Sequence, residues 1–265
     1  MKLAGSNIGW PGEQDEQVLS RMAEAGFAGL EIAPTRLFPE RPYERLREAA
    51  DYAAQIRRRY GLSICSMQSI WYGQPGRIVE SEESRERLLD YTRQAVRFAD
   101  AMDCRNLVFG CPRNRTIDRP EDAETVEQFL LQCAEAAGAY GVVVALEANP
   151  PIYQTNFINT TAQAVALLRK LGHPFLKLNL DFGTVIENGE ALDWIPAEGE
   201  LIHHVHISEP RLAPIRERKE HGTLLRLLEE RGYEGFVSIE MGSREPQILP
   251  AIRYLEELGR DPLRR

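Results

Sequence analysis

Three of the chain's five histidines lie in one short apolar stretch, residues 201–210, with the sequence LIHHVHISEP. The stretch has the composition of a buried strand and contains His203, His204 and His206. Side chains two positions apart on a strand point to the same face, so His204 and His206 are expected to share one face. Imidazoles placed in this way can bind a metal or transfer protons, or they can be hydrogen-bonded residues of a core.

Carboxylates end three other apolar runs in the second half of the chain. Glu147 ends VVVALE, Asp181 ends LKLNLD and Glu240 ends FVSIE. A charged group at the end of a buried run is costly unless it is paired or bound to a metal. Any single one could be a partly hydrated carboxylate without a role, but four consecutive runs with such residues predict one site. Three carboxylates and His206 suit one divalent ion, Mn²⁺ first, with Mg²⁺, Co²⁺ or Zn²⁺ as alternatives.

The elements that would position these residues alternate between strand and helix along the whole chain. We predict strands over 2–9, 28–33, 62–69, 105–110, 142–147, 175–181, 201–207 and 236–240. We predict helices over 13–25, 42–61, 82–102, 120–140, 160–171, 188–195, 216–231 and 245–258. Such alternation is typical of parallel βαβ units, and no GxGxxG fingerprint follows the first strand. The sequence therefore predicts an α/β fold, a single (β/α)₈ TIM barrel domain over residues 1–265.

Composition excludes several classes of function. The chain has 265 residues, of which 43% are hydrophobic and 27% charged, and its net charge of -8 argues against a nucleic-acid partner. No apolar run reaches the roughly 18 residues of a membrane span, so no membrane partner is expected. The cysteines form no CxxC pair and no signal peptide is evident. We therefore expect reduced thiols in a cytoplasmic protein.

With these motifs, the chain resembles the xylose isomerase-like TIM barrels, the sugar phosphate isomerase/epimerase superfamily. The resemblance covers essentially the whole chain and rests on LEANP at Glu147, LNLDFG at Asp181, HVHISE around His206 and YEGFVSIEM at Glu240. In the 3-epimerases of this superfamily the matching Glu, Asp, His and Glu bind one divalent ion, and the two glutamates move the proton beside a carbonyl. The resemblance therefore implies four metal ligands, two of which, Glu147 and Glu240, are also the catalytic acid and base.

The activity that the resemblance implies is that of a metal-dependent sugar isomerase or epimerase. It would act through an enediolate on a small-molecule sugar or polyol ketone. The same enediolate could expel a hydroxyl group, so the alternative is a dehydratase (a lyase) of an inosose or keto-sugar. A DNA-repair enzyme like endonuclease IV is disfavoured by the net charge, and a non-catalytic sugar-binding barrel by the retained carboxylates. Barrels of this superfamily are often dimers or tetramers, so a homo-oligomer is compatible with the resemblance.

Two motifs beside the ligands depart from the epimerase pattern. Epimerases carry DxxH after the sixth strand, whereas Thr184 stands at the position of that histidine here. Their ExxR motif after the seventh strand is also altered, because Glu209 is followed by Pro210 and Arg211. The predicted metal ligands are thus complete while the residues around the substrate differ, and ketose 3-epimerase activity does not follow from the resemblance.

Further positions close to predicted strand ends are candidates for contact with a substrate. Glu31 could instead brace the barrel mouth, His204 could be a packed core residue, and the tryptophans could simply cover the barrel end. The arginines of CPRNR could bind an anionic group, or pair with Asp118 and Glu121 in a solvated loop. His221 precedes a predicted helix and is expected to be a cap or a surface residue. The candidates for substrate binding are Trp10, Glu31, Gln68, Trp71, Arg113, Arg115, Asn149, His204, Glu209 and Arg211.

Overall fold

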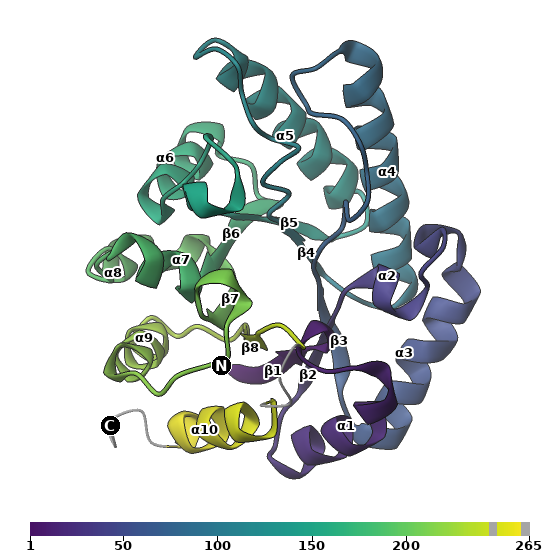
Figure 1. Ribbon diagram of the computed structural model, residues 1–265, viewed down its shortest axis with the longest axis vertical. Helices are drawn as coiled ribbons and strands as arrows, with labels where there is room; N and C mark the ends of the chain where they lie inside the picture. Colours follow the sequence, from purple (N-terminus) through teal and green to yellow (C-terminus); the bar gives the residue numbers. More distant parts are fainter. Residues whose placement is uncertain (244–247, 261–265) are drawn as a thin grey trace.

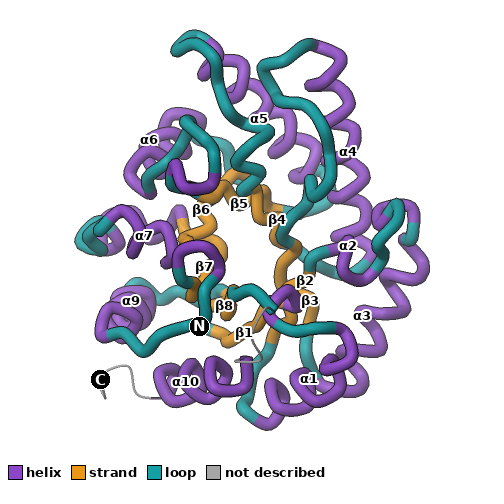
Figure 2. Tube along the Cα trace, in the orientation of Figure 1, coloured by secondary structure: helices purple, strands orange, loops and turns teal. Residues whose placement is uncertain are grey.

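The computed structural model describes residues 1–243 and 248–260, and its strands close into one barrel in chain order. All neighbouring strands are parallel, and the last pairs with the first. Figure 2 shows the strands as an inner ring with the helices outside it. The predicted TIM barrel is therefore confirmed. The strands are β1 Lys2–Ser6, β2 Gly29–Ile32, β3 Ser63–Met67, β4 Asn106–Phe109, β5 Val143–Glu147, β6 Leu176–Asp181, β7 Ile202–Ser208 and β8 Phe236–Glu240.

The helices surround this ring (Figure 1) and pack their apolar faces against it. The α-helices are α1 Asp15–Glu24, α2 Pro34–Leu37, α3 Leu46–Tyr60, α4 Glu82–Ala101, α5 Asp122–Gly138, α6 Thr161–Leu171, α7 Phe182–Asn188, α8 Ile195–Glu198, α9 Lys219–Glu230 and α10 Ile248–Arg260. Short 3₁₀ turns lie at η1 Asn7–Gly9, η2 Gly12–Gln14, η3 Pro42–Glu44, η4 Pro151–Tyr153, η5 Gly199–Leu201 and η6 Pro210–Leu212.

Local signals in the sequence explain most of these boundaries. Thr160 caps α6 in a capping box with Gln163, as its position predicts. The short helix predicted over 188–195 is wrong, because α7 already begins directly after β6. Asp181 caps that helix by accepting a hydrogen bond from Thr184 N at 2.9 Å, and Gly189 ends it with a φ of 62°. The predicted last helix starts at Ile248, and its first three predicted positions lie outside the described residues.

His221 is neither a helix cap nor a surface residue, so that prediction is wrong. It lies on the inner face of α9, on the same side as Leu224, Leu225 and Leu228, and is fully buried. Its Nδ1 atom is 2.9 Å from the hydroxyl of Tyr254. Burial lowers the pKa of His221 to about 4, so it is neutral near pH 7. The i, i+3, i+4, i+7 spacing of these residues contained the signal.

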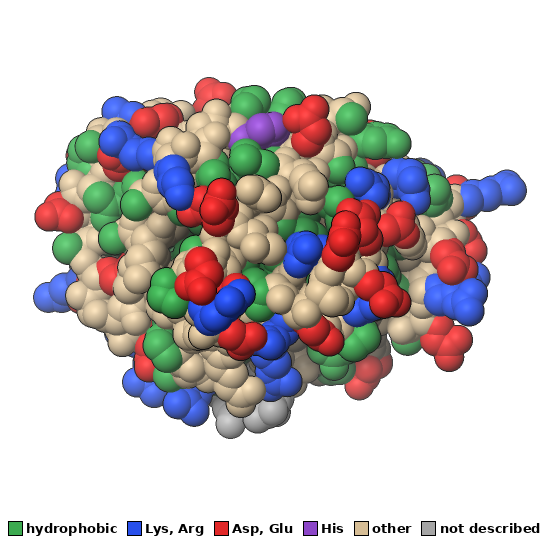
Figure 3. Space-filling view, turned by 90° about the horizontal axis from the view of Figure 1, so that it is seen from above, with side chains coloured by type: hydrophobic (Ala, Val, Ile, Leu, Met, Phe, Trp, Pro, Cys, Tyr) green, Lys and Arg blue, Asp and Glu red, His purple; other side chains and the backbone are tan. Residues whose placement is uncertain are grey.

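The cysteines form no disulfide bond in the structure. All four cysteines are free thiols, and Cys65, Cys104 and Cys133 are buried. Burial raises the pKa of Cys104 to about 12, which keeps it protonated. In the described ranges no helix combines the length and apolar character needed to cross a bilayer. On the face shown in Figure 3, acidic and basic side chains are interspersed among the described residues.

Candidate metal centre and active site

The four predicted ligands come together at the carboxyl ends of the last four strands. Glu147 ends β5, Asp181 ends β6, His206 lies near the end of β7, and Glu240 ends β8. One ligand atom from each side chain lies within 4.8 Å of the other three. Nδ1 of His206 is 3.3 Å from a carboxylate oxygen of Glu147 and 3.3 Å from one of Glu240. Strands far apart in the sequence thus place one imidazole among three carboxylates.

Burial makes this concentration of negative charge unfavourable on its own. Burial, together with the neighbouring carboxylates of Glu147 and Asp181, raises the pKa of Glu240 to about 7, although His206 partly opposes the shift. Burial also raises the pKa of Asp181, again with Glu147 contributing. For His206, burial alone would lower the pKa, but the carboxylates of Glu240 and Glu31 raise it well above its usual value. Each of these pKa shifts means that a positive charge at the centre of the group would be stabilising.

The donor atoms fit a divalent cation. Asn179 lies on the same face of β6 as Asp181, and its Nδ2 donates to Glu147 Oε1 at 2.7 Å. Its Oδ1 atom is buried and has no hydrogen-bond partner among the described residues. An oxygen-rich group with one imidazole nitrogen suits Mn²⁺, Mg²⁺ or Co²⁺, with Zn²⁺ also compatible. Glu147, Asp181, His206 and Glu240 are the residues that could hold such an ion.

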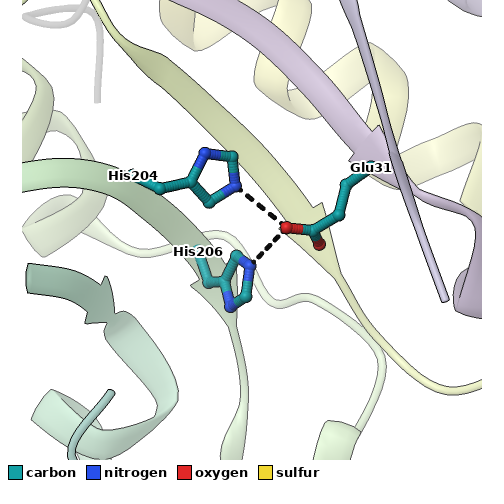
Figure 4. Close-up of side chains that lie close together, drawn as sticks. All are labelled: Glu31, His204 and His206. Carbon is teal, nitrogen blue, oxygen red and sulfur yellow. Dashed lines mark hydrogen bonds and ion pairs between the residues drawn. The ribbon is translucent and has the colours of Figure 1, made fainter. Parts of the chain in front are cut away.

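Behind His206, a buried carboxylate sets the orientation of its ring (Figure 4). Glu31 Oε2 lies 2.9 Å from Nε2 of His206 and 3.0 Å from Nε2 of His204. Burial would raise the pKa of Glu31, but the two imidazoles hold it well below its usual value, so it is ionised. With a cation bound, His206 would keep its proton on Nε2, where Glu31 accepts it, and its Nδ1 lone pair would be free to bind the ion. These contacts place Glu31 behind His206, where it would act as a positioning residue, the second of the two interpretations from sequence.

Short hydrogen bonds hold the carboxylates themselves. Gln68 Nε2 donates to Glu240 Oε1 at 2.9 Å. Asn149 Nδ2 donates to Glu147 Oε2 at 2.8 Å. These contacts fix the side-chain rotamers of both proposed bases, so Gln68 and Asn149 help to preorganise the site.

Sequence reasoning missed the residues that hold Asp181. Ser208 donates a hydrogen bond to Asp181 Oδ1, and the Thr184 hydroxyl lies 2.8 Å from Asp181 Oδ2. Thr184 stands at the position where the epimerase pattern has a histidine, and it forms a hydrogen bond with Asp181, one of the proposed metal ligands. The two-residue spacing of Asn179 from Asp181, and of Ser208 from His206, was the available signal, because such residues share one face of a strand.

A cavity of about 910 Å³ opens above the carboxylates. Its wall contains Glu147, Asp181 and Glu240 together with several of the predicted substrate residues. The sequence did not single out other parts of the wall, namely residues 72–77, Tyr153 and Leu212. The predicted substrate residues that line the cavity are Gln68, Trp71, Arg113, Asn149 and Glu209.

The other predicted substrate residues do not line this cavity in the part of the chain that is described. Glu31 and His204 lie behind the metal centre. Trp10 is buried, and its Nε1 donates to Asp15 at 2.7 Å. Arg211 is exposed, and its backbone N–H donates to the Tyr153 hydroxyl at 2.8 Å. The last of them, Arg115, is treated next.

The two arginines of the CPRNR loop have different environments. Arg115 is fully buried and donates to Glu147 O at 2.7 Å, to Asn149 Oδ1 at 3.0 Å and to Ile158 O at 3.2 Å. Burial lowers the pKa of Arg115 to about 10, so it stays charged. Arg113 is exposed at the cavity wall. Arg115 therefore braces the strand end that carries Glu147.

The alternative, in which the arginines of CPRNR pair with Asp118 and Glu121, is wrong, because both carboxylates have other partners. Asp118 pairs with Arg77, and Glu121 pairs with Arg119.

Comparison with known proteins agrees with this fold. A family model described as xylose isomerase-like TIM barrel matches residues 19–258. The chain belongs to this family.

Individual relatives carry isomerase and epimerase names. A human protein provisionally named hydroxypyruvate isomerase is 29% identical over 266 residues, covering 90% of this chain and 89% of that protein. The apo crystal structure of 3-keto-D-glucoside 4-epimerase from E. coli has a TM-score of 0.78 and 21% identity, covering 98% of this chain and 99% of that one. D-Psicose 3-epimerase from Clostridium cellulolyticum H10, with D-tagatose, has a TM-score of 0.75 and 19% identity, covering 98% and 92%. These structural likenesses support the fold.

The difference between the two arginines generates a first prediction. Arg115→Met removes the hydrogen bonds to Glu147 O and Asn149 Oδ1 and one of the two to Ile158 O, and it leaves an apolar side chain among these polar groups, so we expect a loss of about 3 kcal/mol or more in the free energy of unfolding. Arg113→Met, the matched control in the same loop, is expected to change it by no more than about 0.5 kcal/mol. Urea denaturation followed by circular dichroism measures both. Equal effects of the two substitutions would contradict the bracing role.

The contact behind His206 generates a second prediction. Glu31→Gln removes the charge that fixes the tautomer of His206, so we expect Mn²⁺ affinity to fall about tenfold or more. Electron paramagnetic resonance of free Mn²⁺ during titration measures the affinity. Glu256→Gln is the control, since Glu256 is also buried but pairs with Arg21 and Arg260 on the outside of the barrel. Unchanged affinity in a folded Glu31→Gln protein would rule out the positioning role.

Proposed function

We propose that the protein is a divalent-metal-dependent sugar isomerase or epimerase that moves a proton on a carbon next to a carbonyl group. The observation that carries this proposal is the placement of Glu147 and Glu240. They come from different strands, flank His206, line the same cavity and are each held by an amide donor. Two carboxylates around one substrate carbon are what removal and return of a proton require.

The chemistry uses the inner end of the cavity. A divalent cation held by Glu147, Asp181, His206 and Glu240 would polarise the substrate carbonyl and stabilise the enediolate. One glutamate removes the proton from the adjacent carbon. The other returns it to the opposite face, which gives epimerisation, or to the neighbouring carbon, which gives aldose–ketose isomerisation. Gln68 and Asn149 keep the two carboxylates oriented throughout.

The names of the relatives support this assignment at the level of reaction class. The human relative is named as an isomerase, and the two structural relatives are named as epimerases of a keto-glucoside and of D-psicose. We place Mn²⁺ first among the metals because the donor set is mostly oxygen. The substrate is a small sugar or polyol ketone.

Deuterium incorporation tests the proposal. The protein loaded with Mn²⁺ is incubated in D₂O with free and phosphorylated ketoses, inososes and 3-keto sugars, and the products are read by proton NMR and mass spectrometry. We expect deuterium beside the carbonyl. Glu147→Gln and Glu240→Gln are each expected to slow its incorporation by at least about 100-fold, because each removes a proton-transfer group.

Glu256→Gln, a buried carboxylate on α10 far from the cavity wall, should retain the wild-type rate. Removal of metal with a chelator should abolish the incorporation, and added Mn²⁺ should restore it. A product lighter by one water would assign the dehydratase alternative. Incorporation that survives both glutamate substitutions would refute the proposed acid and base.

A further inference from the structure

The cavity is larger than the proposed proton transfer requires. Its volume of about 910 Å³ lies near the upper end of the roughly 300–1,000 Å³ typical of pockets that enclose drug-sized ligands. The metal ligands occupy only its inner end. Much of the remaining wall comes from residues 68–77 after β3 and residues 110–114 after β4. These two connections run beside each other on one side of the barrel (Figure 1).

Hydrogen bonds fasten these two connections together. Asn114 Nδ2 donates to the carbonyls of Gln74 at 3.2 Å and of Gly76 at 2.7 Å, and Asn114 O accepts from Ile78 N at 2.8 Å. Arg77 forms a two-pronged ion pair with Asp118, at 2.6 and 2.9 Å. The outer wall is thus built before any ligand arrives, which lowers the entropic cost of binding one.

The backbone of these two connections is also held in unusual conformations. Ser69 and Cys111, the second residues past the ends of β3 and β4, have left-handed φ values of 54° and 43°. Gly76 has a φ of 90°, and a Cβ there would lie 2.5 Å from Ser84 Oγ, so only glycine fits. Strained backbone of this kind persists where the surroundings enforce it and is concentrated at functional sites.

The outer region offers aromatic side chains to a ring, and the exposed Arg113 also lies in its wall. Trp71 is buried at its base, with Nε1 donating to Thr92 at 2.9 Å, and Tyr72 stands at its rim with 70% of its surface exposed. Tyr153 also lines the cavity. The charge of Arg77 is already neutralised by Asp118. Aromatic side chains of this kind can bind a hydroxylated or aromatic ring by stacking.

We propose that residues 69–77 and 110–114 form a distal subsite for a second ring, and that the substrate is a glycoside of a keto-sugar instead of a free ketose. This inference rests on the proposed function in one respect, namely that the keto-sugar unit occupies the proposed metal centre. The glycosidic substituent, a second sugar or an aryl group, extends from there between the two connections to Tyr72.

Binding of unreactive glycosides tests the subsite independently of turnover. Dissociation constants of the Mn²⁺-loaded protein are measured by NMR for D-glucose, cellobiose and phenyl α- and β-glucosides, and for the galacto series. We expect at least one glycoside to bind about tenfold more tightly than its parent sugar. Tyr72→Ala should remove most of that preference and leave the affinity for the parent sugar unchanged. Tyr140→Ala, at another exposed tyrosine on the outside of the barrel, should preserve the preference.

The outcomes separate this inference from the proposed function. Equal affinities for glycosides and parent sugars, no binding of any glycoside, or a preference that survives Tyr72→Ala would each overturn the distal subsite. Deuterium exchange in keto-sugars could still succeed in that case. Conversely, a Tyr72-dependent preference for glycosides without any exchange would support the subsite while refuting proton transfer.

Discussion

The rest of the structure depends on how the repulsion among the buried carboxylates around His206 is compensated. Carboxylates repel one another strongly in an interior of low dielectric constant, and they persist there only with donors and positive charge nearby. The closed barrel brings Glu147, Asp181 and Glu240 to one end from three strands, and it supplies amide and hydroxyl donors for each. Glu31 directs His206 towards them from behind. The remaining negative charge is what would allow this group to hold a divalent cation.

This constraint applies to the inner end of the cavity and not to its outer wall. Side chains at strand ends are held by the sheet itself, so the positions of the proposed acid, base and ligands vary little. The outer wall is made by the connections after β3 and β4, which can change in length and sequence without disturbing the barrel. One arrangement of ligands can therefore serve different substrates.

The sequence predicted the barrel and marked the four residues that come together at its mouth, because both depend on short-range patterns. Strand and helix periodicities repeat along the whole chain, and Glu147, Asp181, His206 and Glu240 each lie at or near the end of an apolar run. What it could not predict depends on contacts between distant segments. Arg113 and Arg115 lie two residues apart in the same loop after β4, yet only Arg115 is buried. The contact of Glu31 with His206 crosses the barrel. The hydrogen bonds of Asn114 that join the two connections of the outer wall also link segments distant in the sequence.

The most direct test of the central claim is anomalous diffraction at the manganese absorption edge from crystals grown with Mn²⁺. The account predicts one strong anomalous peak in contact with carboxylate oxygens of Glu147, Asp181 and Glu240 and with Nδ1 of His206. Absence of a peak at that position, or an ion bound through Nε2 of His206 instead, would contradict it. In either case the proposed orientation of His206 and the proton-transfer chemistry would have to be abandoned.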